Sequence, residues 1–412
     1  MAAERDFDVV VFGATGVTGR RVSAYLAEQD ARWAAAARDP GKLERILAED
    51  SVVAPATVIA DVGDPDSLAA MASRARVVLN LCGSYTLHGR PVIEACVSNG
   101  AHYVDLTGEI PFVRQMIDAY DARAQVEGVK VVQVCGFEAL PPDLMVLLAA
   151  ETANERWGEG LAEADLEVSV EGPPGMPRPS DMISGGTFQS LAAAAGGEDA
   201  SAVTDPAALI TDPALAGEVR RRSPINVAPR RAGDAVIAPM APAAFINPAV
   251  IQFTAALVGA EPFRYREGLA LRGPAATLPL RYAAAGVLSG TQAAVAAASR
   301  ARPSVRRRVG AALGRILPSS GFGPAADRLE AWKWHMSVDG RTKGGHTVRV
   351  EVDADGHPGY LATARMLGEA GLLLAETGMT PERSGCLTPA TALGTGSVDR
   401  FQRARLRFSV SP

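Results

Sequence analysis

The chain has 412 residues, which is too long for one compact hydrophobic core and predicts two domains. Its net charge of -5 argues against a general nucleic-acid-binding protein, which would be basic. The short, charged N-terminus lacks the pattern of a signal peptide, and four cysteines (Cys82, Cys96, Cys135 and Cys386) show neither a CxxC pair nor zinc-like spacing. We therefore expect a cytoplasmic enzyme with reduced, partly buried thiols and no metal site.

Residues 7 to about 155 alternate short apolar runs with helical stretches. The strand-like runs are FDVVVF, RWAAAA, ATVIA, RVVLNL, HYVDL and VKVVQV, of which the alanine-rich run is the least strand-like. Buried strands that alternate with helices are typical of βαβ units in a parallel sheet covered on both faces. We therefore predict a Rossmann-type, doubly wound α/β domain over residues 1–155. Pro91, Pro111 and Pro141 are each expected where a helix begins.

Residues 156 to about 356 show a different pattern, in which apolar and polar side chains alternate one by one. ADLEVSVEG places Leu166, Val168 and Val170 on one face, and WKWHMSV and TVRVEVD alternate in the same way around the turn-rich link DGRTKGGH. Such alternation predicts strands with one face buried and one in water, and the link predicts an antiparallel hairpin. We therefore predict a second α+β domain, for substrate binding or dimer formation, built on a mixed or antiparallel sheet.

Residues 357–412 are expected to form a C-terminal helix and strand. GYLATARMLGEAGLLLAETG has the pattern of an amphipathic helix that stops at Gly378, and ARLRFSV that of a final strand. Both are predicted to pack back towards the Rossmann domain.

A glycine-rich turn follows the first strand, in DVVVFGATGVTG. Gly13 permits a tight turn, Gly16 the close approach of a diphosphate, and Gly19 close packing of the first helix on the strand. The diphosphate is then expected at the positive N-terminus of that helix. The spacing is GxxGxxG and not GxGxxG, and a tight βα turn without a ligand is the alternative; the five further βα steps favour dinucleotide binding. The predicted phosphate-binding residues are Gly13, Ala14, Thr15, Gly16, Val17, Thr18 and Gly19.

The residues after the second strand indicate which dinucleotide binds. An NAD site usually ends this strand with an acid that binds the ribose 2′-hydroxyl. Here the strand ends at Ala37 and is followed by Arg38 and, within the next helix, Lys42, whose charges suit the 2′-phosphate of NADP. A surface arginine at a helix entry is the alternative, and Asp39 weakens the signal. We predict NADP, with NAD as the less favoured cofactor.

The third strand, TVIAD, ends in Asp61, which is expected where the adenine binds. Capping of the next loop by Asp64 is the alternative for this region.

Four runs resemble a known family. They are VVLNLCGSYTLHGRPVIEACVSNGAHYVDLTGE, VCGFEALPPDL, and, near the C-terminus, GYLATARMLGEAGLLLA with LTPATALG. With them the chain resembles the saccharopine dehydrogenase-like oxidoreductases, and most closely their trans-acting enoyl reductase branch. The likeness covers most of the chain and is strongest over residues 8–145 and 357–395.

This resemblance implies a Rossmann domain that binds NADP, an inserted mixed-sheet domain, and reduction of an enoyl double bond on a lipid chain. In this branch the lipid chain is assembled by a polyketide synthase that lacks its own reductase, so an acyl carrier protein of the synthase is the implied partner. The chemistry is hydride transfer to the β-carbon and protonation of the α-carbon, and the negative charge on the thioester oxygen needs a fixed donor.

The fourth strand ends at NLCGSY, so Asn80, Gly83, Ser84 and Tyr85 are expected beside the nicotinamide. Tyr85 is the first candidate for the proton donor or for the donor to the enolate oxygen, and His88 is the second. The alternatives are a Tyr85 ring that only packs against the cofactor and a His88 side chain on a surface loop.

Four other polar residues have weaker signals. Asp105 and Glu109, in DLTGE, end the fifth strand at the same crevice, with helix capping as the alternative. His335 is expected on the solvated face of its strand, and His102 in the core.

One loop departs from the family pattern. In GFEALPPDL, Glu138, Ala139 and Leu140 stand where the family leads us to expect aspartate, serine and isoleucine. If this loop contacts the substrate, the departure puts the choice of substrate in doubt.

Residues 235–326 form a basic and apolar block. The stretch 235–260 carries no charge, and its three prolines argue against a membrane-spanning helix. Between Glu267 and Asp327 there is no acidic residue, but there are eight arginines: Arg272, Arg281, Arg300, Arg302, Arg306, Arg307, Arg308 and Arg315.

Three interpretations of this block stay open. Its arginines are dispersed over an alanine-rich surface, or they bind anionic headgroups at the inner face of the plasma membrane, or they dock an acidic carrier protein or a substrate phosphate. In the last two cases Arg306–Arg308 would help to hand over a lipid-like substrate.

Three functions follow from these observations. The leading one is an NADP-dependent enoyl reductase that acts on a long acyl chain. The second is a saccharopine-type amino-acid dehydrogenase that acts on a C–N bond, which would need several cations around the substrate carboxylates. The third is a non-catalytic nucleotide-binding protein on a lipid surface. A homodimer is left open, and nucleic acid is not an expected partner.

Overall fold

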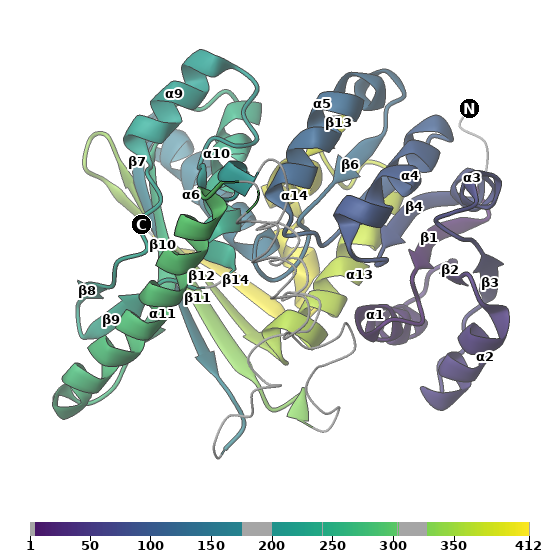
Figure 1. Cartoon of the computed structure of the whole chain (residues 1–412), viewed down its shortest axis with the longest axis horizontal. Helices are drawn as coiled ribbons and strands as arrows, with labels where there is room; N and C mark the ends of the chain where they lie inside the picture. Colours follow the sequence, from purple (N-terminus) through teal and green to yellow (C-terminus); the bar gives the residue numbers. More distant parts are fainter. Residues whose placement is uncertain (1–4, 175–199, 241, 303, 305–327, 412) are drawn as a thin grey trace.

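Two seven-stranded sheets, joined by the long helix α6 (Leu140–Trp157), organise the chain (Figure 1). The computed structural model describes residues 5–174, 200–240, 242–302, 304 and 328–411. The first sheet forms the N-terminal lobe, drawn in purple and blue, and the second sheet forms the other lobe.

All strands of the first sheet are parallel, in the order β13-β6-β5-β4-β1-β2-β3. They are β1 (Phe7–Phe12), β2 (Trp33–Ala37), β3 (Ala56–Ile59), β4 (Ala75–Asn80), β5 (His102–Asp105), β6 (Lys130–Val132) and β13 (Gly385–Leu387). The helices between them are α1 (Val17–Ala27), α2 (Pro40–Glu49), α3 (Pro65–Arg74), α4 (Tyr85–Ser98) and α5 (Ile110–Val126). The order runs outward from β1 in both directions, which confirms the predicted doubly wound α/β fold.

Both faces of this sheet are covered. Val9 and Val11 of β1 belong to a core that includes side chains of α1 and of the C-terminal helix α13 (Thr363–Ala375). Val10 and Phe12 belong to a second core with α3, α4 and α5. Successive side chains of a strand point to opposite faces, so a strand that is apolar throughout needs helices on both sides.

The alanine-rich strand β2 forms as predicted. All of its residues are buried, and it pairs with β1 on one side and β3 on the other. Pairing on both edges and burial of both faces compensate for the weak strand preference of alanine.

The prediction that Pro91 begins a helix was wrong. Pro111 and Pro141 lie in the first turns of α5 and α6, but Pro91 lies inside α4, which begins at Tyr85. The carboxylate of Glu109 accepts hydrogen bonds from the N–H groups of the first turn of α4. Because Glu109 is distant in sequence, rules based on neighbouring residues could not predict that α4 begins at Tyr85.

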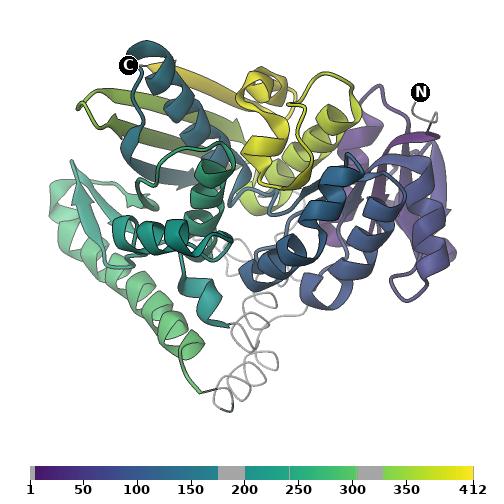
Figure 2. The ribbon, with the colours of Figure 1, turned by 90° about the horizontal axis from the view of Figure 1, so that it is seen from above.

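The C-terminal segment contributes to both lobes. Helix α13 packs against α1, β1 and β4, at the junction of the two lobes (Figures 1 and 2). The final strand β14 (Leu406–Ser411) does not return to the Rossmann domain as predicted, because it pairs with the free edge of β12 in the second sheet. The short strand β13, which the sequence patterns missed, extends the first sheet beside β6, and α14 (Pro389–Leu393) follows it.

The second sheet is mixed, in the order β14-β12-β11-β7-β10-β9-β8. Its other strands are β7 (Leu161–Glu171), β8 (Arg230–Ala232), β9 (Ala235–Ala238), β10 (Arg264–Leu271), β11 (Lys333–Thr342) and β12 (Thr347–Asp355). Strands β11 and β12 form the predicted antiparallel hairpin, and among the described strands of this sheet only β7 and β10 pair in parallel.

The two faces of this sheet differ as predicted. Leu166, Val168 and Met336 are fully buried, and α6 packs against β11 and β12. The opposite face carries polar contacts, among them a hydrogen bond between His335 Nδ1 and Asp353 Oδ1 at 3.0 Å. His335 therefore lies on the solvated face.

The basic and apolar block is in part interior. Its uncharged stretch forms β9 and α10 (Ala243–Leu257), whose residues 243–255 are all buried and cannot face lipid. Arg281 is buried and donates hydrogen bonds to the carbonyls of Asp234 and Leu271, so it stabilises the fold. Figure 2 shows α11 (Leu278–Ser299) along the outer edge of the second lobe, and α9 (Pro213–Arg222) lies in the same lobe.

The predicted hand-over arginines, Arg306–Arg308, lie outside the described residues. In the part of the chain that the structure describes, no helix combines the length and apolar character needed to cross a membrane.

Candidate active site

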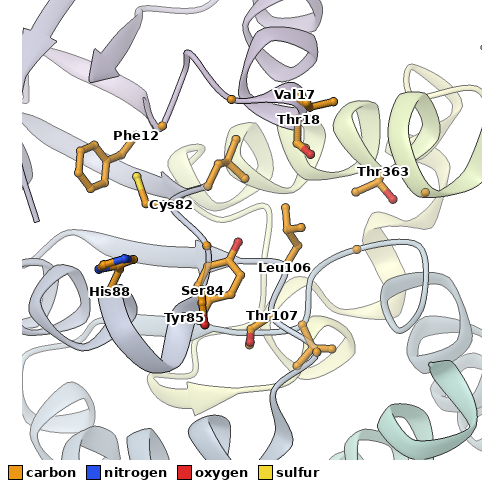
Figure 3. Close-up of a pocket in the computed structure, with 18 of the residues that line it drawn as sticks. Phe12, Val17, Thr18, Cys82, Ser84, Tyr85, His88, Leu106, Thr107 and Thr363 are labelled. Atoms are coloured by element: carbon orange, nitrogen blue, oxygen red, sulfur yellow. The ribbon is translucent and has the colours of Figure 1, made fainter. Parts of the chain in front are cut away.

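A cavity of about 560 Å³ opens at the carboxyl ends of the strands of the first sheet (Figure 3). The loops after β1 to β6 all contribute to its wall. Phe245 and Ile246 of α10, Thr363 at the start of α13, and Tyr360 in the π-helical turn just before it (Pro358–Ala362) complete the wall. In a doubly wound sheet, ligands bind at this edge, where the strand order reverses between β1 and β4.

Gly13 and Gly19, at the turn after β1, leave no room for a Cβ atom. Gly13 has φ +93°, and a Cβ atom there would lie 3.0 Å from the carbonyl carbon of Leu81. A Cβ at Gly19 would lie only 2.2 Å from the carbonyl oxygen of Gly13. The turn and the start of α1 are therefore in direct backbone contact, as predicted for Gly19.

The N-terminus of α1 is open to an anion. Its N-cap residue is Gly16, and no side chain caps the helix. Val17 and Thr18, in its first turn, line the cavity (Figure 3). The N–H groups at the start of a helix and its dipole favour a negative charge, so this cradle fits the diphosphate of a dinucleotide.

The loop after β2 provides a cation beside the cavity. Arg38 lines the cavity, and its charge acts on the Cys82 thiol, whereas its guanidinium has no ion pair among the described residues. Asp39 is turned away, because its carboxylate caps α2 by accepting the N–H of Lys42 at 2.9 Å. Lys42 is exposed and does not line the cavity, so its contact with the cofactor stays a prediction.

Replacing Arg38 by glutamine tests this assignment. We expect the affinity for NADPH to fall about tenfold to a hundredfold, because a charge-assisted hydrogen bond to the 2′-phosphate is lost. The affinity for NADH, which lacks this phosphate, should not change. Fluorescence titration with both nucleotides measures the two effects, and an equal loss for both would show that Arg38 does not select NADP.

Asp61, after β3, lines the same end of the cavity. One of its carboxylate oxygens accepts the N–H of Gly63 at 2.8 Å, which shapes the loop below the expected adenine site. Asp64 caps α3 by accepting the N–H groups of Asp66 and Ser67, which confirms the alternative prediction that Asp64 has a capping role.

The loop after β4 places an aromatic ring in the cavity. In the view of Figure 3, Tyr85 lies between His88 on one side and Leu106 and Thr107 on the other. Its hydroxyl donates to the carbonyl oxygen of Asn80 at 3.2 Å. Burial raises the pKa of Tyr85 well above its ordinary value, so the hydroxyl keeps its proton at working pH.

Asn80 itself faces the protein interior and not the cavity. Its Nδ2 donates to the hydroxyl of Tyr103 at 3.0 Å, and its Oδ1 accepts the N–H of Cys82 at 3.1 Å. Asn80 therefore shapes the loop that carries Gly83 and Ser84, which do line the cavity.

The two acids of DLTGE, Asp105 and Glu109, form hydrogen bonds with other groups of the protein. Glu109 caps α4 from outside: its Oε1 accepts the N–H of Tyr85 at 3.1 Å, and its Oε2 accepts the N–H of Thr86 at 2.8 Å. Asp105 is fully buried and accepts the hydroxyl of Tyr103 at 2.9 Å. Burial raises the pKa of Asp105 to about 7. Capping was the alternative interpretation, but Glu109 caps the preceding helix and not its own.

The loop after β6 carries an acid that the sequence patterns did not single out as a site residue. Glu138 lines the cavity and is partly buried. Burial raises the pKa of Glu138. A hydrogen bond from its own backbone N–H partly offsets this increase by stabilising the carboxylate. The sequence did give one indication that Glu138 could be a site residue. It comes shortly after a strand of the parallel sheet, and ligand-binding residues are common at that position.

Among the described residues, the cysteines and His102 form no second site. Cys82 lines the cavity, and burial raises the pKa of its thiol to about 12; all four cysteines are free. His102 accepts the N–H of Lys130, and burial lowers the pKa of this imidazole to about 4. Among the described residues, no group of three or more His, Cys, Asp and Glu side chains could hold a metal ion.

Most of the predicted site residues thus meet at one cavity. The glycine turn, Arg38, Asp61, the loop 83–85 and His88 line it. Ala14 and Gly19 lie behind the turn, where Ala14 is fully buried and Gly19 contacts Gly13.

Known proteins resemble the chain over its whole length. Residues 9–132 match the saccharopine dehydrogenase NADP-binding domain. The trans-acting enoyl reductase of Mycobacterium tuberculosis (strain ATCC 25618 / H37Rv) is 31% identical, over 98% of this chain and 97% of that protein. The trans-acting enoyl reductase of Mycobacterium ulcerans (strain Agy99) is also 31% identical, over 100% of this chain and 99% of that protein.

A solved structure shares the architecture. Apo saccharopine dehydrogenase (L-Glu forming) from Saccharomyces cerevisiae has a TM-score of 0.52, covering 98% of this chain and 99% of that chain. At 12% identity this likeness concerns the fold alone. The first lobe is an NADP-binding domain, as its sequence match and its glycine cradle agree. The chain therefore belongs to the saccharopine dehydrogenase-like family of NADP-dependent oxidoreductases, in the branch of the trans-acting enoyl reductases.

Proposed function

We propose that the protein reduces the C=C bond of an enoyl group on a long acyl chain, which an acyl carrier protein of a polyketide synthase presents to it. The names of its full-length relatives support this reaction. When bound, NADPH supplies the hydride for the β-carbon. The glycine turn and the first turn of α1 would hold its diphosphate, and Arg38 its 2′-phosphate.

One observation favours an acyl substrate over an amino acid. At β5 and β6 the cavity is lined by apolar side chains, among them Leu106, Val134, Phe245 and Ile246. The described lining residues include no lysine or arginine at this end. Their one such cation, Arg38, follows β2 at the opposite end of the cavity. A saccharopine-type dehydrogenase would have to bind substrate carboxylates here without a counter-charge, which is unfavourable.

Tyr85 is the proposed donor to the thioester oxygen when negative charge develops there. A hydroxyl of raised pKa stays neutral and can donate a hydrogen bond, and the Tyr85 hydroxyl would exchange its bond to Asn80 for one to the substrate. His88, on the first turn of α4, is the second candidate for this role.

The reaction is tested with purified protein, NADPH and an α,β-unsaturated acyl thioester. We expect NADPH to be consumed and mass spectrometry to identify the saturated thioester. A parallel reaction replaces the thioester with a 2-oxo acid and an amino acid. Consumption of NADPH in the parallel reaction alone would favour the amino-acid dehydrogenase, and consumption in neither would contradict the proposed function.

A further inference from the structure

Glu138 places a carboxyl group in the wall of the cavity, at its apolar end. Glu138 follows β6, and its Oε2 lies close to Gly136, where a Cβ atom would be 3.4 Å away. Among the described residues, no side chain donates a hydrogen bond to the Glu138 carboxylate and no cation pairs with it. A carboxyl in this position is stabilised in its protonated form, because burial penalises the charge.

The other acids near this end have their oxygens occupied. Glu109 binds the first turn of α4, and Asp105 binds Thr107 N–H and Val134 N–H through Oδ1 and the Tyr103 hydroxyl through Oδ2. Asp61 lies at the opposite end, after β3. Glu138 is thus the acid of the described lining that faces the expected substrate.

The loop that carries Glu138 is held on both sides. Before it, the N–H of Cys135 donates to the carbonyl of Asp105 at 2.8 Å, and Val134 has φ +61°, a conformation that a β-branched residue rarely adopts. Next to it, the N–H of Phe137 donates to the hydroxyl of Thr363 at 3.1 Å, which in turn donates to Pro358. Strained backbone fixed by such contacts is found where a side chain must be positioned.

We propose that Glu138 is the general acid that protonates the α-carbon of the acyl substrate, an inference that rests on the proposed function. The O–H bond of Glu138 breaks as the new C–H bond forms, and a carboxylate remains. NADPH supplies both electrons as a hydride and becomes NADP⁺. The hydride and the proton from Glu138 together account for the two hydrogens that are added to the double bond. Water from the open cavity then returns a proton to the Glu138 carboxylate.

The substitution Glu138→Gln removes the acidic proton and keeps the shape. We expect kcat to fall at least about a hundredfold, because general acids contribute about 10²- to 10⁴-fold. The affinity for NADPH should not change. In the wild type kcat should decrease as the pH rises through the pKa of Glu138, and the variant should lack this limb. Glu138→Asp, which keeps an acid one methylene shorter, should restore part of kcat and the limb.

Glu151→Gln is the matched control, because Glu151 is an exposed acid on α6 that bonds Thr395 outside the cavity. Its kcat and pH profile should equal those of the wild type. A Glu138→Gln variant with wild-type kcat and pH profile would overturn the proposal. So would a large loss of NADPH affinity with kcat preserved, because Glu138 would then bind the cofactor.

Thermal unfolding without cofactor gives a readout that does not depend on turnover. A carboxyl whose folded pKa is raised contributes stability that is present below its unfolded pKa and is lost as the pH rises through its folded pKa. Replacement by glutamine removes this loss, so the Tm of Glu138→Gln relative to wild type should rise with pH. A Tm difference independent of pH would contradict a protonated Glu138.

The two proposals fail in different ways. If the wild type reduces no enoyl thioester with NADPH, the proposed function is wrong and the catalytic role of Glu138 falls with it, whatever the unfolding data show. If the wild type reduces the thioester and Glu138→Gln does so equally well, only the role of Glu138 is wrong.

Discussion

Replacing Tyr85 by phenylalanine should lower kcat by about 10²- to 10³-fold, the usual effect of removing one donor to a developing oxyanion. The ring stays in place to pack against the cofactor, so the affinity for NADPH should be unchanged. The loss comes from the transition state, where the hydroxyl of Tyr85 would replace its 3.2 Å bond to Asn80 with one to the thioester oxygen. Steady-state kinetics with an enoyl thioester, together with NADPH titration, separates the two effects.

The control for this substitution is Tyr120→Phe, a second buried tyrosine, on α5 and away from the cavity. Its hydroxyl accepts a 3.4 Å hydrogen bond from Arg90 and donates one to the carboxylate of Glu94, so its loss should cost about 1–3 kcal/mol of stability and leave kcat unchanged. If Tyr85→Phe behaves like this control, the Tyr85 ring only packs against the cofactor, and the oxyanion donor is another group, with His88 as the next to test.

Adding a methyl group at Gly19 should damage both the fold and the cofactor site. In Gly19→Ala the new Cβ would lie 2.2 Å from the Gly13 carbonyl oxygen and 2.8 Å from the Ala14 Cα, and backbone atoms cannot yield as a side-chain end does. We expect a loss of about 1–3 kcal/mol in the free energy of unfolding, as for other overpacked sites. The turn must also shift away from the diphosphate, so the affinity for NADPH should fall at least about tenfold.

Gly286→Ala provides the matched comparison. Gly286 lies in the helix α11, and a Cβ added there meets no atom within 4 Å. The same chemical change should therefore stabilise the protein by about 0.4–1 kcal/mol and leave NADPH binding unchanged. Chemical denaturation and fluorescence titration of both variants test this pair, and equal behaviour would mean that the close contact at Gly19 is unimportant.

Periodicity and spacing predict most of the first lobe. The apolar runs, the glycine turn and Arg38 lie within one βαβ unit, so local rules are enough to place them at the carboxyl edge of the sheet. The hairpin β11–β12 is predicted for the same reason, because alternation and turn residues are adjacent in the chain. These features depend on contacts between neighbours in sequence.

The features that were missed depend on distant contacts. Strand β13 pairs with β6, and β14 with β12, across long stretches of chain that no local pattern connects. The early start of α4 depends on the carboxylate of Glu109, which comes from the end of another strand. Glu138 appeared only as a departure from a family pattern, because its place in the cavity wall, away from any side-chain donor among the described residues, is a property of the folded chain.

A crystal structure with bound NADP⁺ would show whether the cavity is a cofactor site. We expect the diphosphate on the N–H groups of residues 16–18, the 2′-phosphate on Arg38, and the nicotinamide at the end of the cavity between Tyr85 and Glu138. A dinucleotide bound elsewhere, or one whose nicotinamide points away from Tyr85 and Glu138, would contradict this expectation.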